Sequence, residues 1–147
     1  MRYIEDKLSG DENLYIAVDP LPVKSSGLAK IISGKSNEPR VSQEIERTLG
    51  SKKLDLVLSD MAPKITGVRI VDDTASRELA EEALNTAFSH LAPGGRLVAK
   101  LFQGLEAESF MAETKECFLK TALFKPAASR SESREIFVVA DGFKAGR

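Results

Sequence analysis

The sequence predicts an α/β fold whose sheet is mostly parallel and ends in an antiparallel strand. Short apolar runs rich in β-branched residues alternate with longer segments of helical periodicity, which is the pattern of strands joined by helical crossovers. The last two runs break this rhythm, because only ten residues, 125–134, separate them. Such a link is too short for a helical crossover, so we expect the final strand to run antiparallel. We expect residues 1–147 to form a single domain.

Five apolar runs are the predicted strands. They cover residues 14–18, 54–58, 96–102, 121–124 and 135–140. The first run ends at Asp19, which Pro20 follows directly, and the second runs into the sequence SDMAP. Aspartate and proline are typical of turns, so both runs have a clear end.

Between the second and third strands, apolar residues recur at spacings of three and four, which predicts a helix with one apolar stripe. The stripe consists of Leu79, Ala80, Ala83, Leu84, Ala87, Phe88 and Leu91. Pro93, Gly94 and Gly95 are expected to stop this helix and turn the chain into the next strand. A second helix is predicted at about residues 107–119 and a shorter one at about 41–49.

The composition is that of a globular protein, with 42% apolar and 29% charged residues among 147. No apolar run approaches the roughly 20 residues of a membrane helix, so we expect no membrane association. The single cysteine, Cys117, excludes an internal disulfide and suits a reducing compartment, so a cytoplasmic location is expected. The net charge of −1 excludes a strongly basic protein, although basic residues cluster late in the chain.

Four ionisable residues are expected at one edge of the sheet. Ligands of open α/β sheets bind beyond the carboxyl ends of the parallel strands. Asp19 and Asp60 each follow such an end, and Lys100 lies in the second half of its strand. An antiparallel final strand would bring its first residue, Glu135, to the same edge. Acids after strands also form turns and cap helices, which explains Asp19 equally well, whereas a lysine within an apolar strand must be partly desolvated or paired.

Several segments, in order along the chain, look like the signature blocks of one family. They are VDPLP at 18–22, SDMAP at 59–63, LAPGG at 91–95, VAKLFQG at 98–104 and SRSESREIFVVA at 129–140. Together they resemble the FtsJ/RrmJ family of RNA ribose 2′-O-methyltransferases. The resemblance implies a Rossmann-like methyltransferase fold, S-adenosylmethionine as the cofactor, and methyl transfer to a ribose 2′-hydroxyl, typically in large-subunit ribosomal RNA.

In this resemblance Asp60, Lys100 and Glu135 match three members of the family's Lys-Asp-Lys-Glu catalytic tetrad. Lys100 would be the base that receives the hydroxyl proton, although a free lysine has a pKa near ~10.4 and is protonated at neutral pH. Asp60 and Glu135 would hold its orientation and raise its pKa. Asp19 would hold the ribose of the cofactor, with Asp60 nearby. No metal site is expected.

Arg130 and Arg134 lead directly into the last strand, at the expected active edge. We predict that they contact phosphates of the RNA, which would be ribosomal RNA or the large ribosomal subunit. The alternative is an ordinary solvated loop.

The resemblance begins within a motif. The family's first strand, its glycine-rich cofactor turn and the first tetrad lysine would come before residue 1, and Lys7 does not fit that lysine's role. We therefore expect that the first strand is missing, that the natural product is longer, and that Met1 is an internal methionine. Lys35 stands where relatives place an acid or a polar residue near the adenine.

Two other functions remain open. One is a catalytically inactive remnant that binds RNA or a protein partner. The other is a methyltransferase acting on a different acceptor, such as a small-molecule hydroxyl or transfer RNA. The sequence predicts neither the target nucleotide nor the oligomeric state.

Overall fold

The computed structural model describes residues 13–24, 27, 29–127 and 133–145. The chain divides into two compact units, Met1–Gly50 and Ser51–Arg147, and each is described by itself. The single-domain organisation therefore stays a prediction.

The first unit is built on two parallel strands, β1 (Tyr15–Asp19) and β2 (Ala29–Ser33), followed by helix α2 (Pro39–Leu49). Proline in the first turn suits a helix, because the N–H that it lacks has no partner within the helix there. The helix buries Val41, Ile45 and Leu49, which lie four residues apart on one face. The strand at 14–18 and the helix at 41–49 are confirmed, whereas β2 was not predicted.

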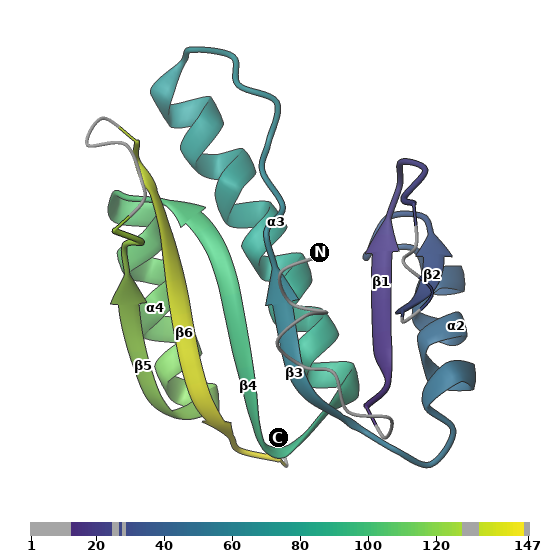
Figure 1. Cartoon of the computed structure of the whole chain (residues 1–147). Coiled ribbons are helices and arrows are strands. Elements are labelled where there is room, and N and C mark those ends of the chain that lie inside the picture. Colours follow the sequence, from purple (N-terminus) through teal and green to yellow (C-terminus); the bar gives the residue numbers. More distant parts are fainter. Residues whose placement is uncertain (1–12, 25–26, 28, 128–132, 146–147) are drawn as a thin grey trace. The chain divides into compact units, whose positions relative to one another are not determined.

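In its described residues, the second unit contains a four-stranded sheet and two helices (Figure 1). Its elements are β3 (Leu54–Ser59), α3 (Arg69–His90), β4 (Leu91–Phe102), α4 (Leu105–Cys117), β5 (Phe118–Phe124) and β6 (Glu135–Phe143). The strand order is β3-β4-β6-β5, with β3 and β4 parallel and β6 antiparallel to both of its neighbours. Of these four strands, β6 alone runs the opposite way. The predicted α/β class with an antiparallel last strand is confirmed.

Helix α3 begins at Arg69, a full ten residues before the predicted apolar stripe at 79. In its first turns the usual pattern is inverted, because Ile70 and Val71 are exposed whereas Asp72, Ser76 and Arg77 are buried. The apolar stripe takes over only further along the helix. A prediction that rests on apolar periodicity cannot detect such a segment.

Residues 93–95 were predicted to end the helix and turn the chain into the next strand, and this is wrong. Helix α3 ends at His90, and residues 93–95 lie within β4 as an irregularity of that strand. Leu54 pairs with Leu91, and Leu56, two residues on, pairs with Arg96, so the register shifts between the two pairs. A side chain at Gly95 would come within 2.9 Å of the Ala92 carbonyl oxygen. Glycine is therefore required where the bulged strand approaches itself.

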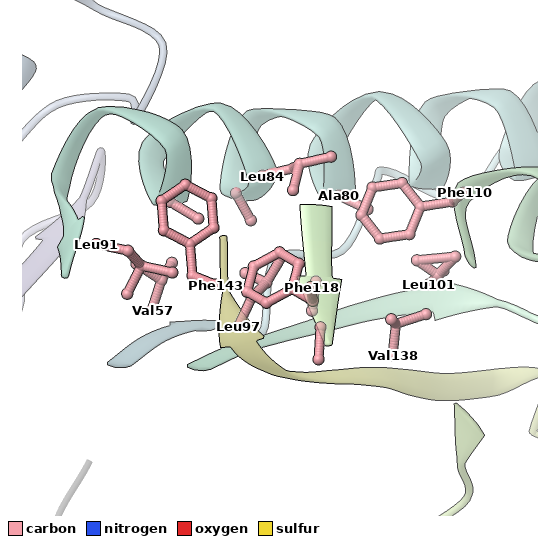
Figure 2. Close-up of a cluster of buried hydrophobic side chains, with 14 of the residues drawn as sticks. Val57, Ala80, Leu84, Leu91, Leu97, Leu101, Phe110, Phe118, Val138 and Phe143 are labelled. Carbon is pink, nitrogen blue, oxygen red and sulfur yellow. The ribbon is translucent and has the colours of Figure 1, made fainter. Parts of the chain in front are cut away.

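Helices α3 and α4 pack on the same face of the sheet and enclose the core (Figure 1). Small residues of α3 let its backbone approach the strands, and aromatic rings fill the space between (Figure 2). The fully or almost fully buried members include Ala80, Ala83, Leu97, Leu101, Phe110, Phe118 and Val138. In the described parts of the chain, no helix combines the length and apolar character needed to cross a membrane.

Replacing Phe110 by alanine should strongly destabilise the second unit. The ring is fully buried, so its removal loses apolar contact and leaves a cavity, at a cost of about 3–5 kcal/mol. Urea unfolding followed by circular dichroism measures this loss. The control is Leu105→Ala on the same helix: the leucine is 82% exposed, and its loss should change stability by no more than about 0.5 kcal/mol. Equal losses in the two variants would contradict this packing.

Candidate active site

Asp60, Lys100 and Glu135, here called the Lys100 cluster, lie together in the second unit. The Lys100 ammonium is 2.8 Å from Asp60 Oδ1 and 3.4 Å from Glu135 Oε1. The lysine side chain is only 13% exposed, whereas the two carboxylates are 73% and 42% exposed. The three residues that the sequence singled out in this unit therefore form one ion-paired group at the surface.

Strand geometry explains this meeting. Asp60 directly follows the last residue of β3, whose parallel partner in β4 is Ala99. Ala99 and Leu101 face the core, so by alternation Lys100 lies on the other face of the sheet. Phe137 of β6 pairs directly with Lys100, and Glu135 lies two residues before it on the same face. Lys100 and Glu135 are thus diagonal neighbours across an antiparallel pair, within reach of long side chains.

The environment of Lys100 raises its pKa above the ordinary value. Burial is the largest single influence and acts to lower the pKa, because a desolvated ammonium is disfavoured. The hydrogen bond and charge of Asp60, followed by those of Glu135, together outweigh it. In this arrangement Lys100 is a cation at neutral pH, so the cluster orients the amine but does not by itself make it basic.

A second carboxylate fixes the loop that follows Asp60. Asp72, in the first turn of α3, accepts hydrogen bonds from the Thr66 N–H (2.8 Å), the Thr66 hydroxyl (2.7 Å) and the Gly67 N–H (3.1 Å). The Thr66 hydroxyl and N–H lower the Asp72 pKa most; burial opposes them, and Gly67 and Arg134 add to the lowering. Sequence reasoning missed this residue, although an aspartate in a first helical turn is a common anchor for the preceding loop.

Arg134 lies against the protein, in contacts that the sequence did not predict. Its guanidinium pairs with Asp73 of α3, lies 3.4 Å from the Gln103 carbonyl oxygen and stands over the Phe102 ring at 5.6 Å. The predicted phosphate contact of Arg134 stays a prediction, and it would have to share the guanidinium with these partners. Arg130 lies outside the described residues.

The expected cofactor residue Asp19 belongs to the first unit, and its position relative to the Lys100 cluster is not defined. It is the last residue of β1, and its Oδ1 accepts a hydrogen bond from the Leu21 N–H at 2.8 Å. This is the turn-forming contact that the alternative explanation anticipated. The Lys35 N–H donates to Glu38 Oε1 at 2.9 Å. Lys7 lies outside the described residues.

Among the residues that the structure describes, no cluster of three or more histidine, cysteine, aspartate or glutamate side chains could hold a metal ion. The expected absence of a metal stays a prediction.

The pKa of Lys100 can be measured directly by NMR titration of 13C-labelled lysine. We expect it above 10.5, and we expect Asp60→Asn to lower it more than Glu135→Gln, because Asp60 is closer and exerts the larger effect. Because the pKa is raised on folding, the stability that this ion pair contributes is present below 10.5 and lost as pH rises through the folded-state pKa. Asp141→Asn, at the far end of β6, is the control and should leave the titration unchanged. A Lys100 pKa below 10.5 in the wild-type protein would contradict the raised pKa.

The Asp72 anchor predicts a loss of stability in acid. Its folded-state pKa is lowered below 3.8, so its contribution is present above that pH and lost as pH falls through the folded-state pKa. Wild type should therefore exceed Asp72→Asn in free energy of unfolding at pH 7, and the difference should shrink below pH 3.8. Chemical denaturation across this pH range measures the difference, and one that stays constant would contradict the anchor.

A family model described as FtsJ-like methyltransferase matches residues 5–143. Ribosomal RNA large subunit methyltransferase E of Chromohalobacter salexigens is 37% identical over 134 residues, which make up 91% of this chain and 64% of that protein. The namesake from Stutzerimonas stutzeri is 38% identical, over 92% of this chain and 66% of its own. The chain thus spans about two thirds of the length of these curated relatives.

Solved structures share the fold. A Plasmodium falciparum protein assigned as a ribosomal RNA methyltransferase superposes with a TM-score of 0.88 at 24% identity, covering 99% of this chain and 80% of its own. Human methyltransferase-like protein 13, in complex with SAH, gives 0.59 at 14% identity, covering 91% of this chain and 63% of its own. The expected Rossmann-like methyltransferase fold is confirmed. Because the family match spans nearly the whole sequence, the chain belongs to the FtsJ-like methyltransferase family.

Proposed function

We propose that this protein transfers a methyl group from S-adenosylmethionine to a ribose 2′-hydroxyl of RNA, with large-subunit ribosomal RNA as the substrate. The observation that carries the proposal is the Lys100 cluster, a partly buried lysine held by two carboxylates in a member of a methyltransferase family. The substrate is inferred from the relatives, which are named ribosomal RNA large subunit methyltransferase E.

Lys100 would act as the general base. S-adenosylmethionine, when bound, would supply a methyl group on a sulfonium, and its transfer to the ribose oxygen would leave a neutral thioether. Neutral Lys100 would take the hydroxyl proton and become an ammonium, which Asp60 and Glu135 then stabilise. The two carboxylates also fix the direction of the amine, and in-line positioning of this kind accounts for much of the acceleration in bimolecular transfers.

The raised pKa of Lys100 sets a requirement on this mechanism. The amine must lose its extra proton before it can accept one, so some of the negative charge around it has to be compensated. Asp60 is the carboxylate best suited to this, because it is 73% exposed and open to a ligand. A cation that engages Asp60 would weaken its hold on Lys100 and lower the lysine pKa towards the working range.

The residues present fit the cofactor in their chemistry. A ribose diol donates two hydrogen bonds, and a carboxylate at the carboxyl end of a parallel strand is a suitable acceptor. Asp19 ends β1 and commits Oδ1 to the Leu21 N–H. Asp60 is mostly exposed and carries negative charge suited to a sulfonium. We propose Asp19 and Asp60 as cofactor-binding residues, and Arg130 and Arg134 as candidates for RNA contact.

One observation favours a second candidate function. A lysine whose pKa is raised by two carboxylates is also what a permanent structural ion-pair network would contain. The alternative is therefore a catalytically inactive member of the family that binds RNA or a protein partner. Isothermal titration calorimetry with S-adenosylmethionine separates the two when it is run on this chain and on one extended at its N-terminus. No binding by either chain would favour the inactive member, whereas binding by the extended chain would favour the enzyme.

A methyl-transfer assay with radiolabelled S-adenosylmethionine and large-subunit ribosomal RNA tests the proposed function. Lys100→Ala should lower the rate by roughly 10²- to 10⁴-fold, the usual contribution of a general base. The control is Arg96→Gln, which removes an exposed ion pair with Asp141 at the opposite end of the β4–β6 ladder and should leave the rate unchanged. Resistance of the product to alkaline hydrolysis identifies the 2′-hydroxyl as the acceptor. Full activity of Lys100→Ala would refute the assigned base.

A further inference from the structure

Arg134 joins three elements around the end of β4. Its backbone carbonyl accepts the Gln103 N–H at 2.7 Å, which extends the β4–β6 ladder beyond the Phe102–Glu135 pair. Its guanidinium reaches in another direction, to Asp73 of α3 and to the Gln103 carbonyl oxygen. Arg134, which immediately precedes Glu135, is therefore bonded both to Gln103 at the end of β4 and to Asp73 of α3.

Asp73 is well placed to hold this arginine. Its side chain is only 15% exposed, whereas the Arg134 side chain is 35% exposed. One turn further along α3, the Ser76 hydroxyl accepts the Phe102 N–H at 3.0 Å. The end of β4 is thus attached to α3 directly through Ser76 and indirectly through Arg134 and Asp73.

Two adjacent aspartates of α3 consequently bind the chain next to the two carboxylates of the Lys100 cluster. Asp72 binds Thr66 and Gly67, in the loop that starts at Asp60. Asp73 binds Arg134, next to Glu135. Neither aspartate pairs with Lys100 in the described structure, so each acts through its neighbour.

We propose that Asp73 and Arg134 are a positioning pair that holds Glu135 against Lys100, so that the first turns of α3 set the geometry of the catalytic lysine. The proposal rests on the proposed function for its catalytic consequence. It gives Arg134 a role within the protein beside the RNA contact proposed above, because its guanidinium already binds Asp73.

The chemistry of arginine suits this role better than that of lysine. A planar guanidinium offers several donors in fixed directions and stacks on rings, so it can bind Asp73, approach the Gln103 carbonyl oxygen and cover the Phe102 ring together. A lysine could keep the ion pair but not the other two contacts. Arg134→Lys is therefore an informative intermediate that retains the charge.

The test compares Arg134→Gln, Asp73→Asn, their double variant and Arg134→Lys in the 147-residue protein. Two quantities are measured: the NMR titration of Lys100 without substrates, and kcat and KM for methyl transfer. Circular dichroism identifies the folded variants. The matched control is Arg96→Gln, because Arg96 and Asp141 pair across the same two strands at their opposite end. A second control is Arg69→Gln, which removes the exposed partner of Asp73.

A positioning role predicts a specific pattern. Arg134→Gln and Asp73→Asn should each lower the Lys100 pKa towards its value in Glu135→Gln, because Glu135 is less well held. Each should lower kcat on the order of 10- to 100-fold with little change in KM for S-adenosylmethionine. The double variant should be no worse than the poorer single one, since the residues act as a unit. In both the Lys100 pKa and kcat, Arg134→Lys should lie between wild type and Arg134→Gln. Both controls should match wild type.

Three results would overturn the proposal. The first is a Lys100 titration unchanged in the folded Arg134→Gln and Asp73→Asn proteins. The second is the pattern of a phosphate contact alone. In that pattern Arg134→Gln increases KM for RNA, whereas Asp73→Asn changes neither kcat nor the titration of Lys100. The third is an equal effect of Arg96→Gln. If neither this chain nor one extended at its N-terminus transfers a methyl group, the proposed function fails, whereas the titration still decides whether Asp73 and Arg134 position Glu135.

Discussion

The antiparallel register between β4 and β6 is the constraint on which the rest of the candidate site depends. Phe102 pairs with Glu135 and Lys100 with Phe137, and the same register places Val138 and Ala140 in the core. A slip of one residue would turn the whole strand over and move Glu135 to the opposite face from Lys100. The burial of apolar side chains, worth roughly 25 cal/mol per Å², therefore also fixes the position of a charged group at the surface.

Within the Lys100 cluster, orientation and basicity oppose each other. A carboxylate that fixes the ammonium also stabilises it and raises the lysine pKa. The two carboxylates differ in how they are held. Glu135 belongs to a paired strand, whereas Asp60 follows the end of a strand and is the more exposed. A carboxylate on a paired strand can keep the amine in place while the more exposed one exchanges its partner for a ligand. This would reconcile a firmly held lysine with the proposed base, which must give up its proton.

The sequence predicted the elements whose pattern is apolar, and it predicted the meeting of Lys100 with Asp60 and Glu135 because the ten-residue link determines the direction of β6. It did not predict the first turns of α3, where exposed Ile70 and Val71 invert the usual pattern. Nor could it assign a partner to Arg134. A guanidinium suits a phosphate and a carboxylate equally, and the carboxylate that it meets is 61 residues away in the chain. Charge type is visible in a sequence, but the pairing of charges depends on tertiary structure.

The inverted half of α3 is explained by what its buried polar groups bind. An uncompensated buried polar group is costly, and each of these is compensated at a different place: Asp72 in the loop after Asp60, Ser76 at the Phe102 N–H, and Arg77 at Glu113 and the Glu106 carbonyl oxygen. Apolar contacts, as in the second half of the helix around Ala83, stabilise without direction and tolerate small shifts. Hydrogen bonds and ion pairs impose distances and angles. One helix can therefore stabilise the core with one half and fix the loop and strand ends around Lys100 with the other.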